Sequence, residues 1–251
     1  MDPKTFLKLP ERNNKPRKSG ITEIMDVGTP TGLLRDYLND FNAYIDFIKF
    51  GIGSAIITPN LREKIKLAKE YNVDVWFGGT LFEKFYSQNQ LNAYIDFLHE
   101  QQVSWVEVSS GTLDQDPESL LKCVEVLKKE FNVVAEVGSK DLSKIMPPSQ
   151  WVHEIKDLLA LDCNYIILEG RESATAGMYR QTGELREGLV ADIISEVDQE
   201  KLIFEAPTPK TQNHFIRQFG ANVNLGNVKL RDILILESQR QALRNETFFI
   251  V

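Results

Sequence analysis

Cysteine, histidine and long apolar runs are all scarce in this sequence of 251 residues. The two cysteines, Cys123 and Cys163, are too few for a disulfide framework and show no CxxC or Cys/His spacing typical of a zinc site. No window approaches 18 uninterrupted apolar residues, and the N-terminal segment lacks the apolar core of a signal peptide. We therefore expect neither a membrane span nor a secretory signal, and the predicted location is the reducing cytoplasm.

Positive charge is also in short supply, because 29 Lys and Arg residues face 36 Asp and Glu residues, a formal net charge of -7. Such a chain has no general field that attracts nucleic acid or an anionic membrane, so an anionic ligand needs a local cationic cluster. Residues 1–20 are the exception, since they are rich in Lys, Arg, Asn and Pro. We interpret them as a basic arm, loosely held on the protein surface and solvated rather than bound to nucleic acid.

Eight short apolar runs begin at Ile21, and each is followed by a turn and a stretch with helical periodicity. The runs are ITEIMD, YIDFIKF, VDVWFGG, VSWVEVSS, NVVAEVG, NYIILEG, KLIFEAP and ANVNLGN. Eight strands alternating with helices predict a single-domain (β/α)₈ TIM barrel over residues 21–251. An open doubly wound sheet uses the same units, but its dinucleotide fingerprint is incomplete here, because Gly51-Ile52-Gly53 is not followed by the third glycine.

Several local signals mark the intervening helices. Asp116-Pro117 and Thr58-Pro59 predict helix starts, and Gly220 predicts a left-handed helix stop. The first of these helices has an apolar face made of Leu120, Val124, Leu127 and Phe131. The hexapeptide NAYIDF occurs twice, and we interpret residues 42–47 as strand entry and residues 92–97 as helix.

Unusual polar residues stand where the predicted strands end, which is where α/β barrels carry their chemistry. They are Asp26, Lys49, Glu107, Ser109, Glu136, Glu169, Arg171 and Glu205. Any one of these carboxylates is more often a structural partner of a neighbouring Lys or Arg than a catalyst. Several carboxylates at one barrel mouth, however, repel each other unless cations compensate them. Lys49, Lys140 and Arg171 can supply part of this compensation, and a divalent metal can supply the rest.

The residue types at the mouth indicate which metal this is. The candidate ligands are oxygen atoms, whereas His99, His153 and His214 all fall in predicted helices. Hard oxygen ligands favour Mg²⁺ over zinc or iron.

Three segments at the same end of the barrel have features of a phosphate site. Gly78-Gly79-Thr80 follows the third strand, and barrels often bind phosphate after the seventh and eighth strands. The candidate substrate-binding residues are Gly79, Thr80, Lys210, Asn224, Gly226 and Asn227. Glycine and asparagine here are equally compatible with plain turns.

An ordered series of strand-end motifs resembles the phosphosulfolactate synthase family from about Ile21 to the C-terminus. The motifs are YIDFIKFG, GGTLFE, WVEVSSGT, AEVGSK, YIILEGRES, LIFEAP and VNLGNV. The resemblance implies a Mg²⁺-dependent addition of sulfite to phosphoenolpyruvate that gives (2R)-phospho-3-sulfolactate. The basic arm, and Ser110-Gly111 in place of an acidic turn, depart from the family pattern.

Roles for the strand-end residues follow from that implied reaction. We expect Glu136 and Glu169 to be the first Mg²⁺ ligands, with Glu107 and Glu205 next. Lys140 is the expected general acid, because it lies just past the fifth strand beside those carboxylates. Lys49 and Arg171 are expected to bind the substrate carboxylate or sulfite, and Mg²⁺ to stabilise charge on that carboxylate as a Lewis acid.

Two other kinds of function stay open at this point. A metal-independent Schiff-base lyase would use Lys49 or Lys140 as an amine nucleophile. A non-catalytic role is the other, because plant heat-stress-associated proteins also resemble the family, although unused buried charges are costly to keep. Barrels often associate, so a homo-oligomer is favoured although no segment marks an interface.

Overall fold

The eight apolar runs form eight short parallel strands in the computed structural model, which describes residues 6–113, 117–141 and 146–250. The strands are β1 Thr22–Asp26, β2 Phe47–Phe50, β3 Asp74–Phe77, β4 Trp105–Val108, β5 Asn132–Val137, β6 Tyr165–Leu168, β7 Leu202–Glu205 and β8 Leu225–Val228. They pair in the order β3-β2-β1-β8-β7-β6-β5-β4. Because the first strand pairs with the last, the predicted single-domain (β/α)₈ barrel is confirmed and the open sheet is excluded.

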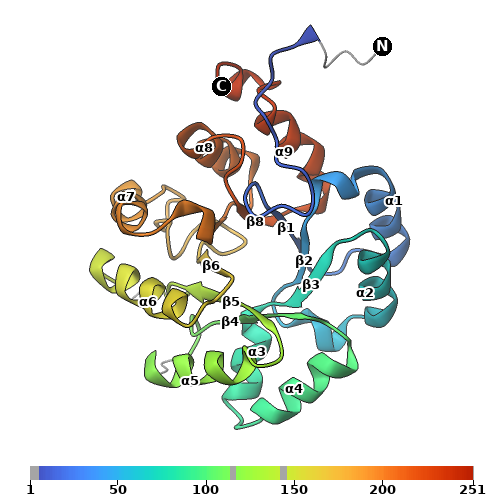
Figure 1. Ribbon diagram of the computed structural model, residues 1–251, viewed down its shortest axis with the longest axis vertical. Coiled ribbons are helices and arrows are strands. Elements are labelled where there is room, and N and C mark those ends of the chain that lie inside the picture. The colour runs from blue at the N-terminus through green and yellow to red at the C-terminus, as the bar shows by residue number, and fades with distance from the viewer. Residues whose placement is uncertain (1–5, 114–116, 142–145, 251) are drawn as a thin grey trace.

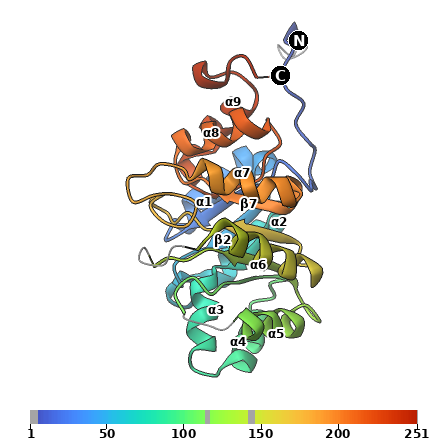
Figure 2. The same cartoon turned by 90° about the vertical axis from the view of Figure 1, so that its left-hand side faces the viewer.

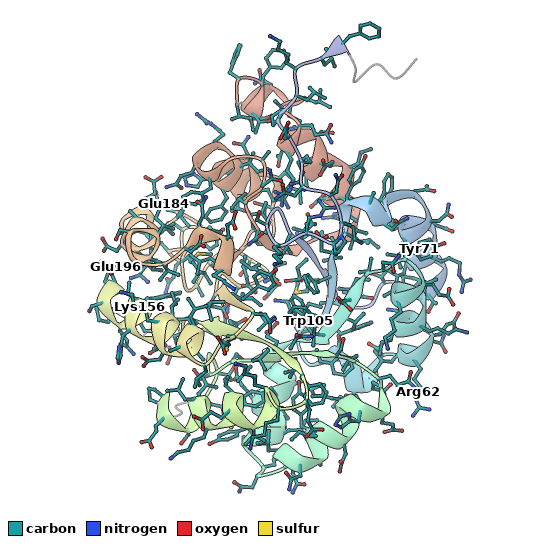
Figure 3. The ribbon with its side chains drawn as sticks, viewed as in Figure 1. Arg62, Tyr71, Trp105, Lys156, Glu184 and Glu196 are labelled. Carbon is teal, nitrogen blue, oxygen red and sulfur yellow. The ribbon has the colours of Figure 1, made fainter. Side chains whose placement is uncertain are left out.

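Helices surround the strands on all sides (Figure 1). Those with labels are α1 Thr31–Phe41, α2 Leu61–Glu70, α3 Gly79–Tyr86, α4 Leu91–Glu100, α5 Pro117–Leu127, α6 Pro148–Ala160, α7 Glu187–Glu196, α8 Pro209–Phe219 and α9 Ile233–Arg240. Ion pairs join neighbouring helices at the surface, as Lys156 of α6 does with Glu196 of α7 at 2.7 Å (Figure 3). Such exposed pairs contribute little to stability, so the helices are held mainly by their buried faces.

Most of the helix predictions are confirmed, with small shifts at the ends. The predicted apolar face of α5 is buried at Leu120, Val124 and Leu127, and all three histidines lie in helices. Helix α2 begins at Leu61, later than predicted, because Asn60 before it has a left-handed φ of 57°. Gly220 ends α8 with a φ of 86° but an extended ψ of 178°, so it is not the predicted left-handed stop. Asp116 lies outside the described residues.

The repeated hexapeptide adopts different structures in its two copies. Residues 42–44 form a short 3₁₀ helix, and β2 begins only at Phe47, so the strand enters later than we predicted. Residues 92–97 lie within α4, as predicted. The repeat therefore has no common structural role.

The barrel has two apolar regions, one on each face of its strands. The larger region lies between the strands and the surrounding helices. The smaller region fills the lower interior of the barrel and consists of Ile21, Phe47, Trp76, Val134, Ile167 and Ile203. Since parallel strands are covered on both faces, they appear in the sequence as nearly continuous apolar runs.

A seam between β3 and β4 completes the barrel, since these two strands are the ends of the hydrogen-bonded ladder. The Glu107 side chain bridges the seam by accepting hydrogen bonds from Trp76 Nε1 at 2.9 Å and from the Gly79 backbone N at 2.6 Å. A buried carboxylate therefore supplies part of the bonding that a regular strand pair would supply elsewhere.

The basic arm is fastened to the end of the barrel opposite the mouth, where Figures 1 and 2 show it beside α9. Arg12 Nε lies 3.3 Å from Glu237 Oε1, and Arg17 Nε lies 3.0 Å from Asp46 Oδ1. Lys15 donates to the carbonyl oxygen of Asn42 at 3.1 Å. The expectation of a loosely held arm is therefore wrong from Arg12 onward, because its basic side chains have partners on the barrel.

Candidate active site

Alternation along the strands turns one charged layer into the upper interior of the barrel. The layer consists of Glu23 on β1, Lys49 on β2, Glu107 on β4, Glu136 on β5, Glu205 on β7 and Glu169 directly after β6. All six side chains are buried, with exposures of 4% or less. Because successive residues of a strand face opposite sides, these charges stand directly above the apolar lower interior. We call these six residues the charged layer.

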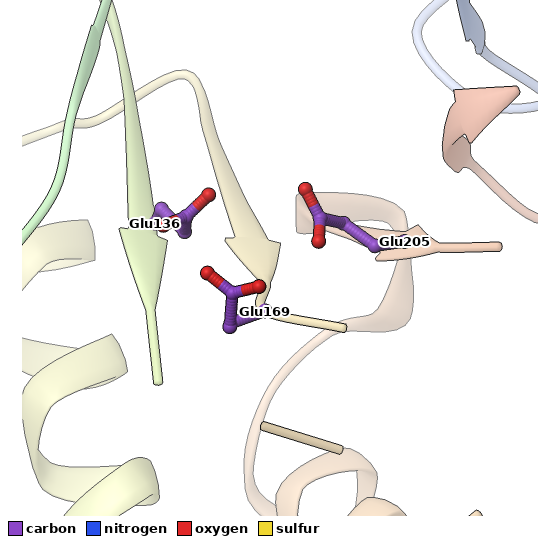
Figure 4. Close-up of side chains that lie close together, drawn as sticks. All are labelled: Glu136, Glu169 and Glu205. Carbon is purple, nitrogen blue, oxygen red and sulfur yellow. The ribbon is translucent and has the colours of Figure 1, made fainter. Parts of the chain in front are cut away.

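Three carboxylates of the charged layer lie close enough to share one metal ion. Each of Glu136, Glu169 and Glu205 offers an oxygen, and these oxygens lie within 4.8 Å of one another (Figure 4). Oε2 of Glu169 is buried and accepts no hydrogen bond, although Lys140 Nζ lies 3.3 Å away. A buried acceptor without a hydrogen bond is costly, and a cation at this place would satisfy it.

Lys140 reaches the same three-carboxylate cluster from the loop that follows β5. Its Nζ lies 2.7 Å from Glu136 Oε1 and 3.9 Å from Glu83 Oε1, in addition to the Glu169 contact. Burial would lower the pKa of Lys140, but the Glu136 and Glu169 carboxylates outweigh it and raise that pKa above its ordinary value. The side chain is therefore a protonated ammonium group at neutral pH.

Lys49 is the cation at the centre of the charged layer. Its Nζ lies 3.0 Å from Glu205 Oε1, 3.6 Å from Glu23 Oε2 and 3.8 Å from Glu107 Oε2. Burial alone would lower the pKa of Lys49, but the surrounding carboxylates raise it well above its ordinary value. A Schiff-base nucleophile must be a neutral amine, so these carboxylates disfavour the covalent mechanism at both Lys49 and Lys140.

The charged layer carries an excess of negative charge. Its five carboxylates face two ammonium groups, those of Lys49 and Lys140, which leaves three negative charges uncompensated if every group is ionised. Burial and the neighbouring Glu136 and Glu205 carboxylates accordingly raise the pKa of Glu169 well above its ordinary value. Burial would raise the pKa of Glu136 too, but Lys140 and Lys49 outweigh it and lower that pKa. Protons or a divalent cation must therefore complete the site.

Glu107 belongs to the charged layer but not to the three-carboxylate cluster. Both of its oxygens accept the hydrogen bonds that bridge the seam to Trp76 and Gly79. Burial raises the pKa of Glu107 to about 7, and Lys49 opposes that shift. Glu107 is not one of the three carboxylates whose oxygens lie within 4.8 Å of one another, so the candidate metal site in the described part of the chain omits it.

The predicted substrate-binding residues are divided by the structure. Gly79, Thr80, Arg171 and Asn227 line a cavity of about 50 Å³ at the mouth, together with Lys49, Lys140 and the carboxylates of the cluster. The Gly79 N–H donates its hydrogen bond to Glu107, and a Cβ at Gly79 would lie 2.2 Å from Ser109 Oγ. This glycine is thus required by close packing, not by the approach of a phosphate.

Three of the predicted phosphate ligands do not reach that cavity. The prediction is wrong for Asn224, whose side chain binds the Ile21 N–H at 3.0 Å and the Leu202 carbonyl at 3.0 Å at the opposite end of the barrel. Gly226 is buried in β8, where its lack of a side chain leaves space for Glu23. Lys210 is exposed on α8 and lines separate cavities.

Other strand-end residues also differ from the expectation. Asp26 faces outward, where it accepts a hydrogen bond from Lys64 Nζ at 2.8 Å, so it holds α2 and not a ligand. Glu23 was not among the predicted site residues. It lies two residues before Met25 on β1, so both side chains are on the strand face that points into the barrel. Glu83 was also not predicted, because it lies in a helix, α3, and not at a strand end. Its carboxylate accepts a hydrogen bond from the Thr112 N–H at 3.0 Å and contacts Lys140.

The chain is similar to several known proteins. The profile of a family described as (2R)-phospho-3-sulfolactate synthase (ComA) matches residues 10–246. The chain is 38% identical over 247 residues to the phosphosulfolactate synthase of Bacillus subtilis (strain 168), which covers 97% of this chain and 98% of that one. It is 25% identical over 249 residues to Protein HEAT-STRESS-ASSOCIATED 32 of Arabidopsis thaliana, covering 88% of this chain and 86% of that one.

Solved structures support the fold alone. A phosphonopyruvate hydrolase, solved in complex with oxalate and Mg²⁺, superposes with a TM-score of 0.56 at 11% identity, covering 86% of this chain and 77% of that one. None of the helices in the described ranges is both long enough and apolar enough to cross a bilayer.

Proposed function

This chain is a lyase-type enzyme of the phosphosulfolactate synthase family, and on that premise we propose that it adds sulfite to phosphoenolpyruvate with Mg²⁺, giving (2R)-phospho-3-sulfolactate. The observation that carries the proposal is the three-carboxylate cluster with Lys140 beside it. This arrangement supplies a metal site and a proton donor in one partly closed mouth.

The residues of the mouth fit Mg²⁺ by ligand type and by charge. Glu136, Glu169 and Glu205 would hold the ion, since all three offer carboxylate oxygens and Glu169 Oε2 accepts no hydrogen bond. The charged layer also has excess negative charge that a divalent cation reduces. When bound, Mg²⁺ supplies positive charge that stabilises negative charge developing on the substrate carboxylate.

The side chains of the mouth have separate tasks in the proposed reaction. Sulfite and phosphoenolpyruvate are both anions that repel each other, so Arg171 and Lys49 are proposed to bind the carboxylate or sulfite group. Sulfur attacks the methylene carbon, a C–S bond forms, and the electron pair of the double bond moves toward C2 and the carboxylate. Thr80 and Asn227 also line the mouth and are the remaining candidates there for contact with the phosphate.

Lys140 is proposed to complete the reaction by giving a proton from Nζ to C2. Its raised pKa ensures that the proton is present at neutral pH, although it also makes the ammonium a weaker acid. Transfer stays favourable because a carbon that carries charge next to a carboxylate is a far stronger base than an amine. Glu136 and Glu169 hold the ammonium on the same side of the mouth as the proposed metal ligands.

The test is a phosphorus NMR assay of the purified chain with phosphoenolpyruvate, sulfite and Mg²⁺. We expect a new phosphate-ester signal that disappears when sulfite is omitted or EDTA is added. Lys140→Met should lower kcat by roughly a hundredfold or more with a much smaller change in KM, whereas Lys129→Met, at an exposed lysine, should not. Turnover that resists EDTA, with borohydride trapping of substrate, would instead establish the Schiff-base mechanism.

A protein that is folded yet shows no turnover would count against the proposal. The similarity to the heat-stress-associated protein of Arabidopsis thaliana makes this a concrete alternative. The complete charged layer favours catalysis, because five buried carboxylates are expensive to maintain without a use.

A further inference from the structure

A second cavity lies beside the mouth, beneath the loops that follow β5 and β6. Its volume is about 320 Å³, and none of the carboxylates of the charged layer lines it. Its lining includes Asp141, Trp151, Arg180 and Arg186. Cavities of this size suit small organic ligands, whereas the mouth cavity measures only about 50 Å³.

Two arginines give this second cavity a positive character. Arg180 and Arg186 belong to residues 169–186, a long connection between β6 and α7 that has no helix or regular strand of its own. Long connections inside compact domains are usually functional. This one is ordered by a hairpin turn, in which the Arg180 N–H donates to the Glu184 carbonyl at 2.8 Å and the Arg186 N–H to that of Met178 at 2.8 Å.

Neither guanidinium group forms an ion pair with any residue that the structure describes. Arg186 donates to the backbone carbonyls of Gly177 at 3.1 Å and Met146 at 3.3 Å, which fixes it over the cavity. Burial, reinforced by the charge of Arg180, lowers the pKa of Arg186. Among the described residues of the lining, Asp141 is the one carboxylate and Arg180 and Arg186 are the two arginines.

Trp151 adds a hydrogen-bond donor that has no acceptor within the described residues. The ring lines the second cavity, is only 1% exposed, and its Nε1 is buried without a partner. The other two indoles both have carboxylate acceptors, since Trp76 donates to Glu107 and Trp105 to Asp74. A buried N–H without an acceptor costs stability, and a ligand acceptor in the adjoining cavity would relieve that cost.

We propose that this second cavity binds the phosphate or sulfonate group of a small organic anion, through Arg180, Arg186 and the indole N–H of Trp151. A tetrahedral oxyanion accepts several hydrogen bonds at once and reduces the repulsion between two arginines. The oxyanion could belong to the substrate or product of the mouth, or to a separate effector. The inference does not depend on the proposed reaction, because binding is measured without turnover.

The primary experiment titrates inorganic phosphate into the ¹⁵N-labelled chain while the three indole N–H signals are followed. We expect the Trp151 signal, assigned through its contact with Gly138, to shift and saturate, while the Trp76 and Trp105 signals stay in place. The double variant Arg180→Gln/Arg186→Gln should weaken phosphate binding tenfold or more, because loss of a single hydrogen bond to a charged group typically weakens binding by about that factor. The control Arg217→Gln, at an exposed arginine of α8, should bind like the wild type.

The possible outcomes distinguish the sources of the oxyanion from each other and from a result that contradicts the proposal. If the double variant also raises KM for phosphoenolpyruvate in the phosphorus assay, the cavity holds a substrate group. If KM is unchanged while phosphate binding is lost, the ligand is a separate anion. A Trp151 signal that does not respond, or equal phosphate affinity in the double variant and the wild type, would overturn the proposal whether or not the chain turns over phosphoenolpyruvate.

Discussion

Glu169→Gln should separate metal binding from stability, because it removes a candidate ligand carboxylate without changing the shape of the side chain. Burial and neighbouring carboxylates raise the pKa of Glu169 well above its ordinary value, which favours the protonated form of this group in the metal-free protein. Glutamine resembles the protonated acid, and it also lessens the negative excess of the charged layer. We therefore expect the variant in EDTA to be as stable as the wild type, within about 1 kcal/mol.

Magnesium should then distinguish the two proteins. A concentration of about a hundred times Kd stabilises a binding protein by about 2.7 kcal/mol, or roughly 5–10 °C in a chain of this size. The wild type should show this rise in thermal unfolding, and Glu169→Gln should lose most of it because one of the three ligand carboxylates is gone. Glu125→Gln on the exposed face of α5 serves as the control. An unchanged magnesium shift in Glu169→Gln, or a large loss of stability in EDTA, would refute the assignment.

Three further predictions concern the barrel itself. Lys49→Met leaves the carboxylates around it without their cation, so it should lower the free energy of unfolding in urea by about 3–5 kcal/mol. A loss no larger than that of Lys129→Met would contradict this role of Lys49. Gly79→Ala places a Cβ 2.2 Å from a neighbouring hydroxyl and should cost about 1–3 kcal/mol, whereas Gly188→Ala in open space on α7 should be neutral or stabilising by thermal melting. Burial raises the pKa of Glu107 to about 7, so its contribution to stability is full below its ordinary pKa and is lost as pH rises through 7. Urea unfolding in EDTA at a series of pH values should show this fall. An equal fall in Glu107→Gln would exclude Glu107 as its cause.

The fold could be predicted because the barrel repeats one signal eight times. Each strand is covered on both faces, so each appears as a short apolar run, and the eight runs contain seven strands whole and all of β8 but its last residue. Boundaries were harder, as at Asn60, where one left-handed residue delays α2 beyond the proline that marks its expected start. Such a conformation depends on local packing and leaves little trace in periodicity.

The site was predicted where alternation along a strand decides it. Glu136 and Lys140 share one parity, and the structure joins them at 2.7 Å. The same rule would have placed Glu23 inside and Asp26 outside, but the prediction relied on nearness to the strand end instead. Asn224 failed for a related reason, since it precedes β8 and therefore lies at the opposite end from the mouth.

Contacts that cross between elements far apart in the sequence could not be predicted. Glu83 lies on α3 and contacts Lys140 on a loop beyond β5, and no spacing in the sequence links the two. The seam is similar, since the bond from Trp76 to Glu107 exists only because the ladder ends at β3 and β4. Such side chains have ordinary local patterns, and only closure of the barrel brings them together.

The arrangement of charges along the barrel axis explains how an acidic barrel can act on anions. The carboxylates are deepest, on or next to the strands, with Lys49 among them. The other cations that line the two cavities lie above them on loops: Lys140 after β5, and Arg171, Arg180 and Arg186 after β6. An approaching anion therefore meets the arginines and Lys140 first, and a divalent cation is attracted past them by the excess negative charge below. The two ligand types are thus drawn to different depths of one site. This order requires that metal binding strengthen anion binding, so phosphate affinity at the mouth should rise when Mg²⁺ is added, while affinity at the Arg180 cavity, which lacks the metal ligands, should change far less.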